Sequence, residues 1–327
     1  MSYLENPKTY TGTDLETIFF RPMLSGPSAE QLGIRILYNM PVPTTIQLWD
    51  AKRDILQKYT AAGWNGGTAS RKYQKTIRLS RVKAELGFSA ADYFSMVYEL
   101  ITGRPDVNMD DLSGTGLEKA ETELFRRSIA EGIRVTMWIG DTTGTKGYNT
   151  FDGFLKPILA GISEETVYST TYTAQDLTAP AKIIDIFESL YANSVEQVKD
   201  LKAEGQLAYF VTSDLYHLYE RYLDSIGAEA AYRERIQGRD QLAYHGIPVV
   251  DIRLTSYLTG TSYHKSFGML TDRRNLVLAV NTSDFPGNEI RMWYNPDLME
   301  NRQRAVFMAG CEVLDEALIS YAHLAAS

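Results

Sequence analysis

One stretch of the sequence has the composition of a ligand-binding loop. Gly140-Asp-Thr-Thr-Gly-Thr-Lys-Gly147 is rich in glycine and threonine and contains one lysine. A phosphate-binding loop needs a second glycine five residues after the first, then a lysine, and it precedes a helix. Here Thr145 occupies that fifth position, and the helical pattern lies before the loop. We interpret the loop as a structural turn, with phosphate binding as the alternative.

Residues that bind metals or act as nucleophiles are few and far apart. No two of the four histidines share a metal-ligand spacing, and the single cysteine, Cys311, lies in an apolar run that favours a buried, unreactive thiol. The sequence contains no G-x-S-x-G nucleophile elbow and no recognisable pair of glycosidase carboxylates. We therefore expect no enzyme activity, no catalytic residue, no cofactor and no metal site. The histidines are His217, His245, His264 and His323.

Basic residues are concentrated in one segment of an acidic chain. Between Asp50 and Lys83 there are nine basic and two acidic residues, a charge of +7, whereas the whole chain carries −8 and its remainder therefore −15. Such a separation indicates that one part of the molecule meets another part, or another copy. The candidate assembly residues in this segment are Lys72, Lys75, Arg78 and Trp64.

Aromatic and basic residues together could also form a platform for single-stranded nucleic acid. Trp49 and Trp64 lie beside or within the basic segment. However, a remainder of −15 repels a phosphate backbone, and no recognition helix is visible. Contact between subunits is the preferred interpretation, and nucleic-acid binding is the alternative.

The basic segment lies within a predicted β-hairpin over residues 34–88. Its ascending arm runs through residues 34–38 and 44–49, and residues 63–67 supply the glycine and asparagine that a turn requires. On the return arm the apolar residues change from odd to even positions near Arg81, which predicts a bulge or a change of packing partner there. A hairpin this long and polar cannot bury both faces in one small domain. We expect it to project from the body and to find burial elsewhere.

The hairpin is flanked by a proline-containing arm and a helical region. Residues 1–33 show no sustained period, which predicts an extended arm that gains order on a partner; a frayed terminus is the alternative, but the cluster Ile18-Phe19-Phe20 prefers burial. Residues 89–101 are predicted to be helical. The strongest helix is predicted over residues 116–139, where a capping box (Thr115 with Glu118) precedes an apolar stripe at helical spacing.

The second half of the chain alternates helices with strands, which favours an α+β fold class. Helices are predicted over 181–191 and 213–223, the second capped by Ser213, and strands over 207–211, 248–252 and 276–280. Residues 305–321 begin uniformly apolar, and their period does not separate helix from strand. No apolar run is long enough to cross a bilayer and no signal pattern begins the chain, so we expect synthesis in the cytosol and no membrane partner.

Four stretches, in their order along the chain, resemble the major capsid proteins of tailed bacteriophages, which have the Hong Kong 97-type capsid fold. Residues 77–92 are similar to the return from that family's extended loop, and residues 117–156 to its long spine helix and the glycine-rich segment after it. Residues 244–252, which contain Gly246-Ile-Pro-Val-Val250, resemble a strand of the family's axial domain, and residues 270–280 resemble a late family strand. The resemblance covers nearly the whole chain.

The resemblance implies a domain organisation. It consists of an N-terminal arm (1–33), an extended β-hairpin loop (34–88), a peripheral domain in two segments (89–180, with the spine helix at 116–139, and 289–327) and an axial domain between them (181–288). It also implies self-assembly of hexamers and pentamers into an icosahedral shell around double-stranded DNA. Separate scaffolding and portal proteins are implied partners, packaged DNA would lie non-specifically close, and the protein would be part of the virion, assembled in the host cytoplasm.

The chain departs from some members of this family. It has no long charged segment ahead of the arm, so a scaffolding domain is expected to be a separate protein or to have been removed. Crosslinking between subunits, known in some members, needs a loop lysine, an asparagine and a glutamate, but these types are too common here to transfer the role. Encapsulins, compartments that package enzymes, share the fold and are the alternative function; an enzyme is the third.

Overall fold

The computed structural model describes residues 8–10, 29–39, 44–49, 72–89, 116–145, 147–227, 235–236, 239–240, 242–281, 289–295, 297–298 and 300–325. These residues form two six-stranded sheets and two short two-stranded ones. The first sheet has the order β1 (Lys8–Tyr10), β14 (Glu289–Asn295), β15 (Glu300–Val313), β13 (Leu276–Asn281) and β2 (Arg35–Tyr38), and β5 (Ser80–Ser89) pairs with β15. The second has the order β10 (Ala243–Tyr244), β11 (Ile247–Asp251), β7 (Leu207–Val211), β12 (Phe267–Asp272), β16 (Ser320–Leu324) and β6 (Tyr168–Tyr172).

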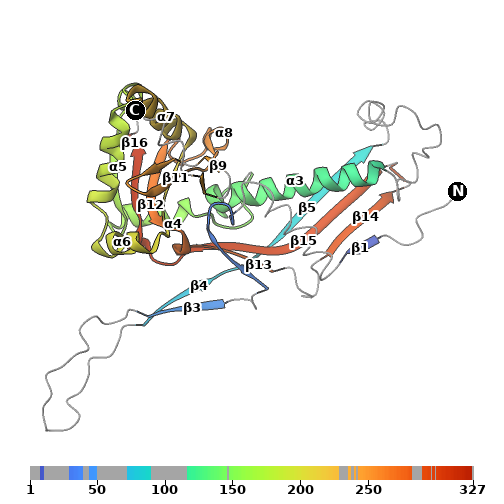
Figure 1. Cartoon of the computed structure of the whole chain (residues 1–327). Helices are drawn as coiled ribbons and strands as arrows, with labels where there is room; N and C mark the ends of the chain where they lie inside the picture. The colour runs from blue at the N-terminus through green and yellow to red at the C-terminus, as the bar shows by residue number, and fades with distance from the viewer. Residues whose placement is uncertain are drawn as a thin grey trace, which may run out of the picture.

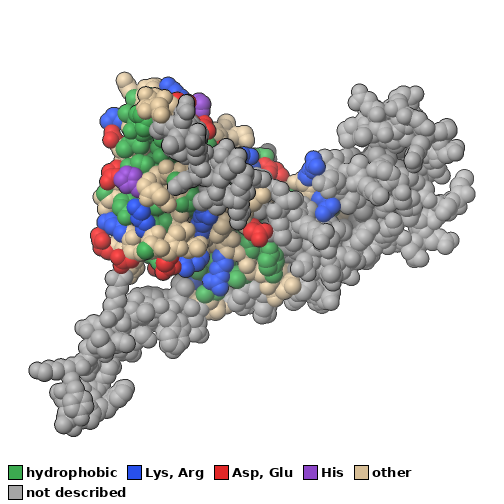
Figure 2. Space-filling view, in the orientation of Figure 1, with side chains coloured by type: hydrophobic (Ala, Val, Ile, Leu, Met, Phe, Trp, Pro, Cys, Tyr) green, Lys and Arg blue, Asp and Glu red, His purple; other side chains and the backbone are tan. Residues whose placement is uncertain are grey.

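The helices divide between the two sheets. The long helix α3 (Gly116–Ile139) runs along the first sheet, and α5 (Lys182–Ala192), α6 (Glu196–Leu201) and α7 (Ser213–Ser225) gather around the second (Figure 1). The shorter α4 (Leu155–Ser163) and α8 (Thr255–Leu258) lie near the end of α3. Acidic, basic and apolar side chains are interspersed over the α5–α7 side (Figure 2).

The central strands of the second sheet, β7 and β12, are buried on both faces. In β7, successive side chains contribute to two different cores. Ala208 and Phe210 point into a core that also contains the end of α3 and residues of the first sheet. Leu207, Tyr209 and Val211 belong to a different core, built with α5 and α7. Because successive side chains of a strand point to opposite faces, a strand with no polar residue needs cover on both sides.

The remaining strands form the hairpin and a minor pair. In the hairpin, β3 (Thr44–Trp49) pairs antiparallel with β4 (Lys72–Ile77), with Thr44 opposite Ile77 and Trp49 opposite Lys72. The pair points away from the rest of the described chain (Figure 1). The minor pair is β8 (Arg235–Ile236) with β9 (Arg239–Asp240).

Several predicted elements are confirmed by the structure. Helix α3 spans residues 116–139, strand β7 spans residues 207–211, and α5, β11 and β13 lie within one residue of their predicted bounds. The change of partner predicted near Arg81 is also confirmed: β4 pairs with β3, whereas β5, which begins at Ser80, pairs with β15. The ambiguous residues 305–321 are mainly strand, in β15 and the start of β16.

Two predictions about local structure are wrong. Residues 35–38 are not part of the hairpin, because β2 pairs parallel with β13 in the first sheet. Ser213 does not cap α7 but is its first residue, after the N-cap residue Thr212. The Ser213 hydroxyl instead donates to the carboxylate of Asp251, at 2.9 and 3.1 Å from its two oxygens.

The described parts of the predicted arm are held within the chain. Strand β1 pairs with β14, and Ala29 and Leu32 are buried in the core beside α3. Residues 1–7 and 11–28 of the arm, residues 90–101 of the predicted helix, the capping residue Thr115 and the hairpin tip lie outside the described residues. Ser89, the first residue of that predicted helix, is the last residue of β5.

Candidate functional site

The hairpin is anchored to the body at one buried residue. Ile77, at the end of β4, is 1% exposed and packs with Val277 and Ala279 of β13. Ile46 on β3 is partly buried against the same cluster, and Thr45 and Thr76, which pair with each other between Ile77 and Ile46, are exposed. The threonine hydroxyls are 3.2 Å apart across the strands. Apolar burial therefore holds the base of the hairpin to the body.

After the hairpin, the chain crosses directly over a glycine. A Cβ at Gly310 of β15 would lie 2.2 Å from the carbonyl oxygen of Arg78. Such a distance is far inside van der Waals contact, so any other residue at position 310 would push the crossing segment away. The close approach lets the chain leave β3 at Ile77 and begin pairing with β15 at Ser80.

An ionic cluster also ties the hairpin to the body. The Lys75 ammonium on β4 lies 3.1 Å from Glu316 Oε1 and 3.6 Å from Glu312 Oε1. Glu312 is on β15, and Glu316 begins the short helix η5 (Glu316–Leu318) that leads to β16 in the second sheet. The Thr166 hydroxyl, just before β6, donates to Glu316 Oε2 at 3.3 Å. Lys75 thus joins the hairpin to the link between the two sheets.

Burial and charge act in opposite directions within this cluster. Burial raises the pKa of the Glu312 carboxyl, and the nearby Lys75 ammonium opposes that rise. Burial alone would lower the pKa of Lys75, but its hydrogen bond to Glu316 and the two negative charges outweigh burial and raise it. The cluster positions the hairpin and offers no nucleophile.

An open groove of about 360 Å³ lies between α3 and β5. Its floor is largely apolar, and the ion pair of Lys83 with Glu85, 2.8 Å long, lies at its wall. The apolar lining residues include Leu86, Phe125, Ile129, Phe151 and Phe307.

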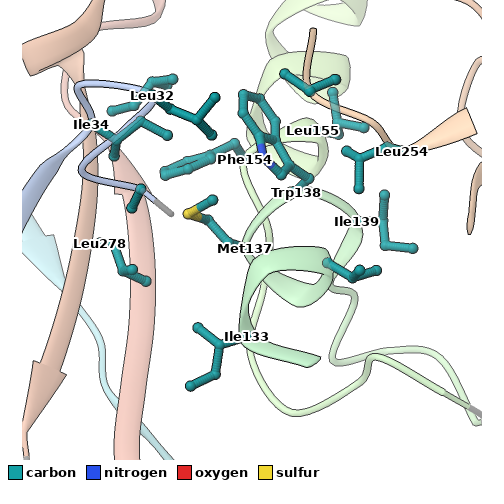
Figure 3. Packing of buried hydrophobic residues seen from close by; sticks show 14 of the residues in the cluster. Leu32, Ile34, Ile133, Met137, Trp138, Ile139, Phe154, Leu155, Leu254 and Leu278 are labelled. Carbon is teal, nitrogen blue, oxygen red and sulfur yellow. The ribbon is translucent and has the colours of Figure 1, made fainter. Parts of the chain in front are cut away.

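The end of α3 is the point at which the two sheets meet. Trp138 is fully buried, with its ring centroid 5.5 Å from that of Phe154 and 5.8 Å from that of Phe210 on β7. Figure 3 shows Trp138 and Phe154 side by side above Met137, with Leu155 and Leu254 nearby.

One turn earlier on α3, an arginine fixes the loop after β11. The Arg134 guanidinium donates to the carbonyl oxygens of Ile252 (2.9 Å) and Arg253 (3.3 Å). It also forms two hydrogen bonds with Glu131, to which the Tyr257 hydroxyl donates at 2.7 Å. Together with Trp138, these contacts set the position of the second sheet relative to α3.

The polar side chains of the glycine- and threonine-rich loop bond to residues that follow it in the chain. The Thr142 hydroxyl donates to Asp152, and the Lys156 ammonium lies 2.7 Å from both Asp141 and Asp152. The hydrogen bond from Lys156 is the main reason that the pKa of Asp141 falls to about 2. These contacts favour the structural-turn interpretation over phosphate binding.

The thiol of Cys311 lies under this loop. It donates to the backbone carbonyl of Asp152 at 2.9 Å, and burial raises its pKa. Such a thiol is a poor nucleophile, because the thiolate is the reactive form. Among the described residues no group of three histidine, cysteine or acidic side chains could hold a metal ion. No helix in the described part of the chain is long and apolar enough to cross a membrane.

The structure describes three of the four predicted assembly residues. Lys75 contacts a glutamate of its own chain, and Arg78 is exposed at the crossing beside Gly310. Lys72 lies at the far end of β4, and Trp64 lies outside the described residues. The part of these four residues in assembly stays a prediction. Glu316 was missed, since nothing in the local sequence links it to Lys75.

Comparison with known proteins gives a consistent answer for the fold. No family model and no curated protein matches the sequence. A chain of the satellite phage P4 procapsid with its size determination protein matches with a TM-score of 0.56 and 10% identity, over 99% of this chain and 95% of that one. A chain of Gordonia phage Cozz (TM-score 0.52, 12% identity, 91% of this chain and 86% of that one) and a chain of the capsid of Myoviridae phage XM1 (TM-score 0.52, 14% identity, 90% and 91%) also match. The chain has the Hong Kong 97-type capsid fold.

Helix α3 has the bounds that were predicted for the spine helix of this fold. The predicted boundaries of the peripheral and axial domains stay predictions. The pairing of the strands does not follow the predicted axial range, residues 181–288. Strands β6 and β16 lie outside residues 181–288 but pair within the second sheet, and β13 lies inside that range but pairs within the first.

Proposed function

We propose that this chain is the major capsid protein of a tailed bacteriophage, whose copies assemble into the icosahedral shell around double-stranded DNA. The observation that carries the proposal is a fold shared with a phage procapsid chain over almost the full length of both. In this proposal the protein is a structural part of the virion, assembled in the host cytoplasm with separate scaffolding and portal proteins.

The hairpin supplies the physical reason for assembly. Isolated two-stranded hairpins are marginally stable in water, and this one is anchored in its own subunit by Ile77 and Lys75 at its base. Its remaining surface gains stability only by contact with another molecule. A neighbouring copy offers the open apolar groove between α3 and β5.

Charge supports the same pairing of copies. The segment from Asp50 to Lys83 carries +7, whereas residues 99–131, which include the first part of α3, contain eight acidic and four basic residues. Each exposed pair contributes only about 0–1 kcal/mol. Repetition at every contact of a closed shell makes the sum large.

Sedimentation and electron microscopy of the purified protein test the proposal. We expect rings, capsomers or closed particles under crowding or with the cognate scaffolding protein. A compact monomer under all of these conditions would contradict it. Particles recovered from the native source should contain double-stranded DNA. Particles filled with an enzyme would instead favour an encapsulin-type compartment.

A further inference from the structure

Two of the four histidines are stacked on each other at the C-terminal strand. His323 lies on β16, and His264 lies in the loop before β12. Their ring centroids are 3.8 Å apart, with an angle of 27° between the planes. His264 Nδ1 lies 3.3 Å from the Tyr321 hydroxyl oxygen, within hydrogen-bonding distance. The His323 Nδ1 atom is buried without a hydrogen-bond partner.

The surroundings of the pair contain little that could stabilise a positive charge. Tyr321 is fully buried and stacks on Phe267, and the hydroxyl groups of Tyr172 and Ser266 bond to each other at 2.6 Å. Lys265, beside His264 in the chain, is exposed. No carboxylate among the described residues acts on either ring: burial and the neighbouring His323 lower the pKa of His264 to about 4, and burial lowers that of His323.

The stacked rings lie where β16 pairs with β12 and with the edge strand β6. His323 is opposite Phe267 of β12 and Thr171 of β6. Next to it, the Leu324 amide donates to the Ser266 carbonyl, and the Ala325 amide donates to the Tyr172 carbonyl. Because β6 lies at the edge of the described sheet and pairs there with β16, loosening β16 also frees β6.

We propose that His264 and His323 form an acid-sensitive clasp, which holds β16 and the edge strand β6 to the second sheet while both rings are neutral and releases them when the rings take up protons. Two positive charges 3.8 Å apart repel each other strongly, and each would also lose hydration. The clasp acts within one subunit, whether or not the chain forms a shell.

The sign of the pH effect follows from the lowered pKa values. Histidines in the released strand have an ordinary pKa near 6.5, so below that pH the released state binds protons that the clasped state excludes. The clasp is therefore complete above about pH 6.5 and weakens as the pH falls toward 4.

Hydrogen exchange of the full chain tests the clasp. The ratio of amide protection in β16 and β6 to that in the central strand β7 should fall about ten-fold or more between pH 7.5 and pH 5. H217Q, at an exposed histidine on α7, should show the same fall. The variant H264F/H323F keeps two aromatic rings that cannot take up a proton. In this variant the protection ratio should not depend on pH.

Two results would overturn the clasp. One is a wild-type ratio that is equal at both pH values, and the other is an undiminished fall in the double variant. If the double variant does not fold, imidazole NMR of the wild-type protein decides. His264 should remain neutral until close to pH 4, and protonation of His264 near pH 6.5 would rule the clasp out.

Discussion

The second sheet and the hairpin are both built from strands, but they find burial in different places. Every residue of β7 and β12 is buried within the subunit, between α5 and α7 on one side and the end of α3 on the other. Of the described hairpin side chains, only Ile77 is buried. A strand with cover on both faces stabilises its own subunit, whereas a strand without cover has surface left for a partner.

The largest effect is expected where the second sheet meets α3. Trp138→Ala should lower the free energy of unfolding by about 3–5 kcal/mol, because it removes a fully buried ring that contacts Phe154 and Phe210. Chemical denaturation measures the loss. Tyr168→Ala, on the exposed edge strand β6, is the control and should cost less than about 1 kcal/mol. Similar losses for both variants would mean that Trp138 does not join the two sheets.

Charge reversal on the hairpin should affect assembly and leave the subunit intact. Reversing Lys72, Lys75 and Arg78 together is a poor test, because a glutamate at position 75 would face Glu312 and Glu316. K72E/R78E avoids this and should change the free energy of unfolding by less than about 0.5 kcal/mol. It should block shell formation or slow it greatly, as measured by light scattering.

A control with the same change of charge is R221E/K265E, at two exposed residues outside the hairpin. It should assemble normally. Added salt should weaken wild-type assembly in the same direction as the hairpin variant, because salt screens exposed charges. Normal particles from K72E/R78E would show that the basic hairpin does not act through charge, and would favour the nucleic-acid alternative.

A modest loss of stability is expected at the base of the hairpin. Lys75→Met should lower the free energy of unfolding by about 1 kcal/mol, because it leaves two carboxylates, one of them half-buried, without their cation. Lys83→Met on β5 removes an ion pair whose two partners are both exposed, and should cost close to zero. Equal losses in thermal or chemical unfolding would show that the Lys75 cluster does not hold the hairpin.

The sequence predicts elements well where their pattern is local and long. The apolar stripe of α3 continues for several turns and ends at a glycine, and β7 has no polar residue, so both were predicted to the residue. Residues 35–38 look like any strand, and nothing nearby reveals that their partner is β13, far later in the chain. Ser213 has the residue type of a helix cap, but its hydroxyl donates to Asp251 of strand β11, which is distant in the sequence.

The candidate site was less predictable for the same reason. The charge of the hairpin is visible in the sequence, but the carboxylates that bind Lys75 come from β15 and η5. The stacking of His264 on His323 likewise depends on the pairing of β12 with β16. Contacts between distant segments need the fold before they can be inferred.

Hydrogen exchange of the free subunit and of the assembled shell tests most directly whether the hairpin finds its burial on a neighbour. In the free subunit, amides of β3 and β4 should exchange much faster than those of β7, because local opening requires little loss of apolar contact. On assembly, the hairpin amides should become strongly protected while β7 changes little. Equal protection of β3 and β4 in monomer and shell would contradict the account, because the hairpin would then be stabilised entirely by its own subunit.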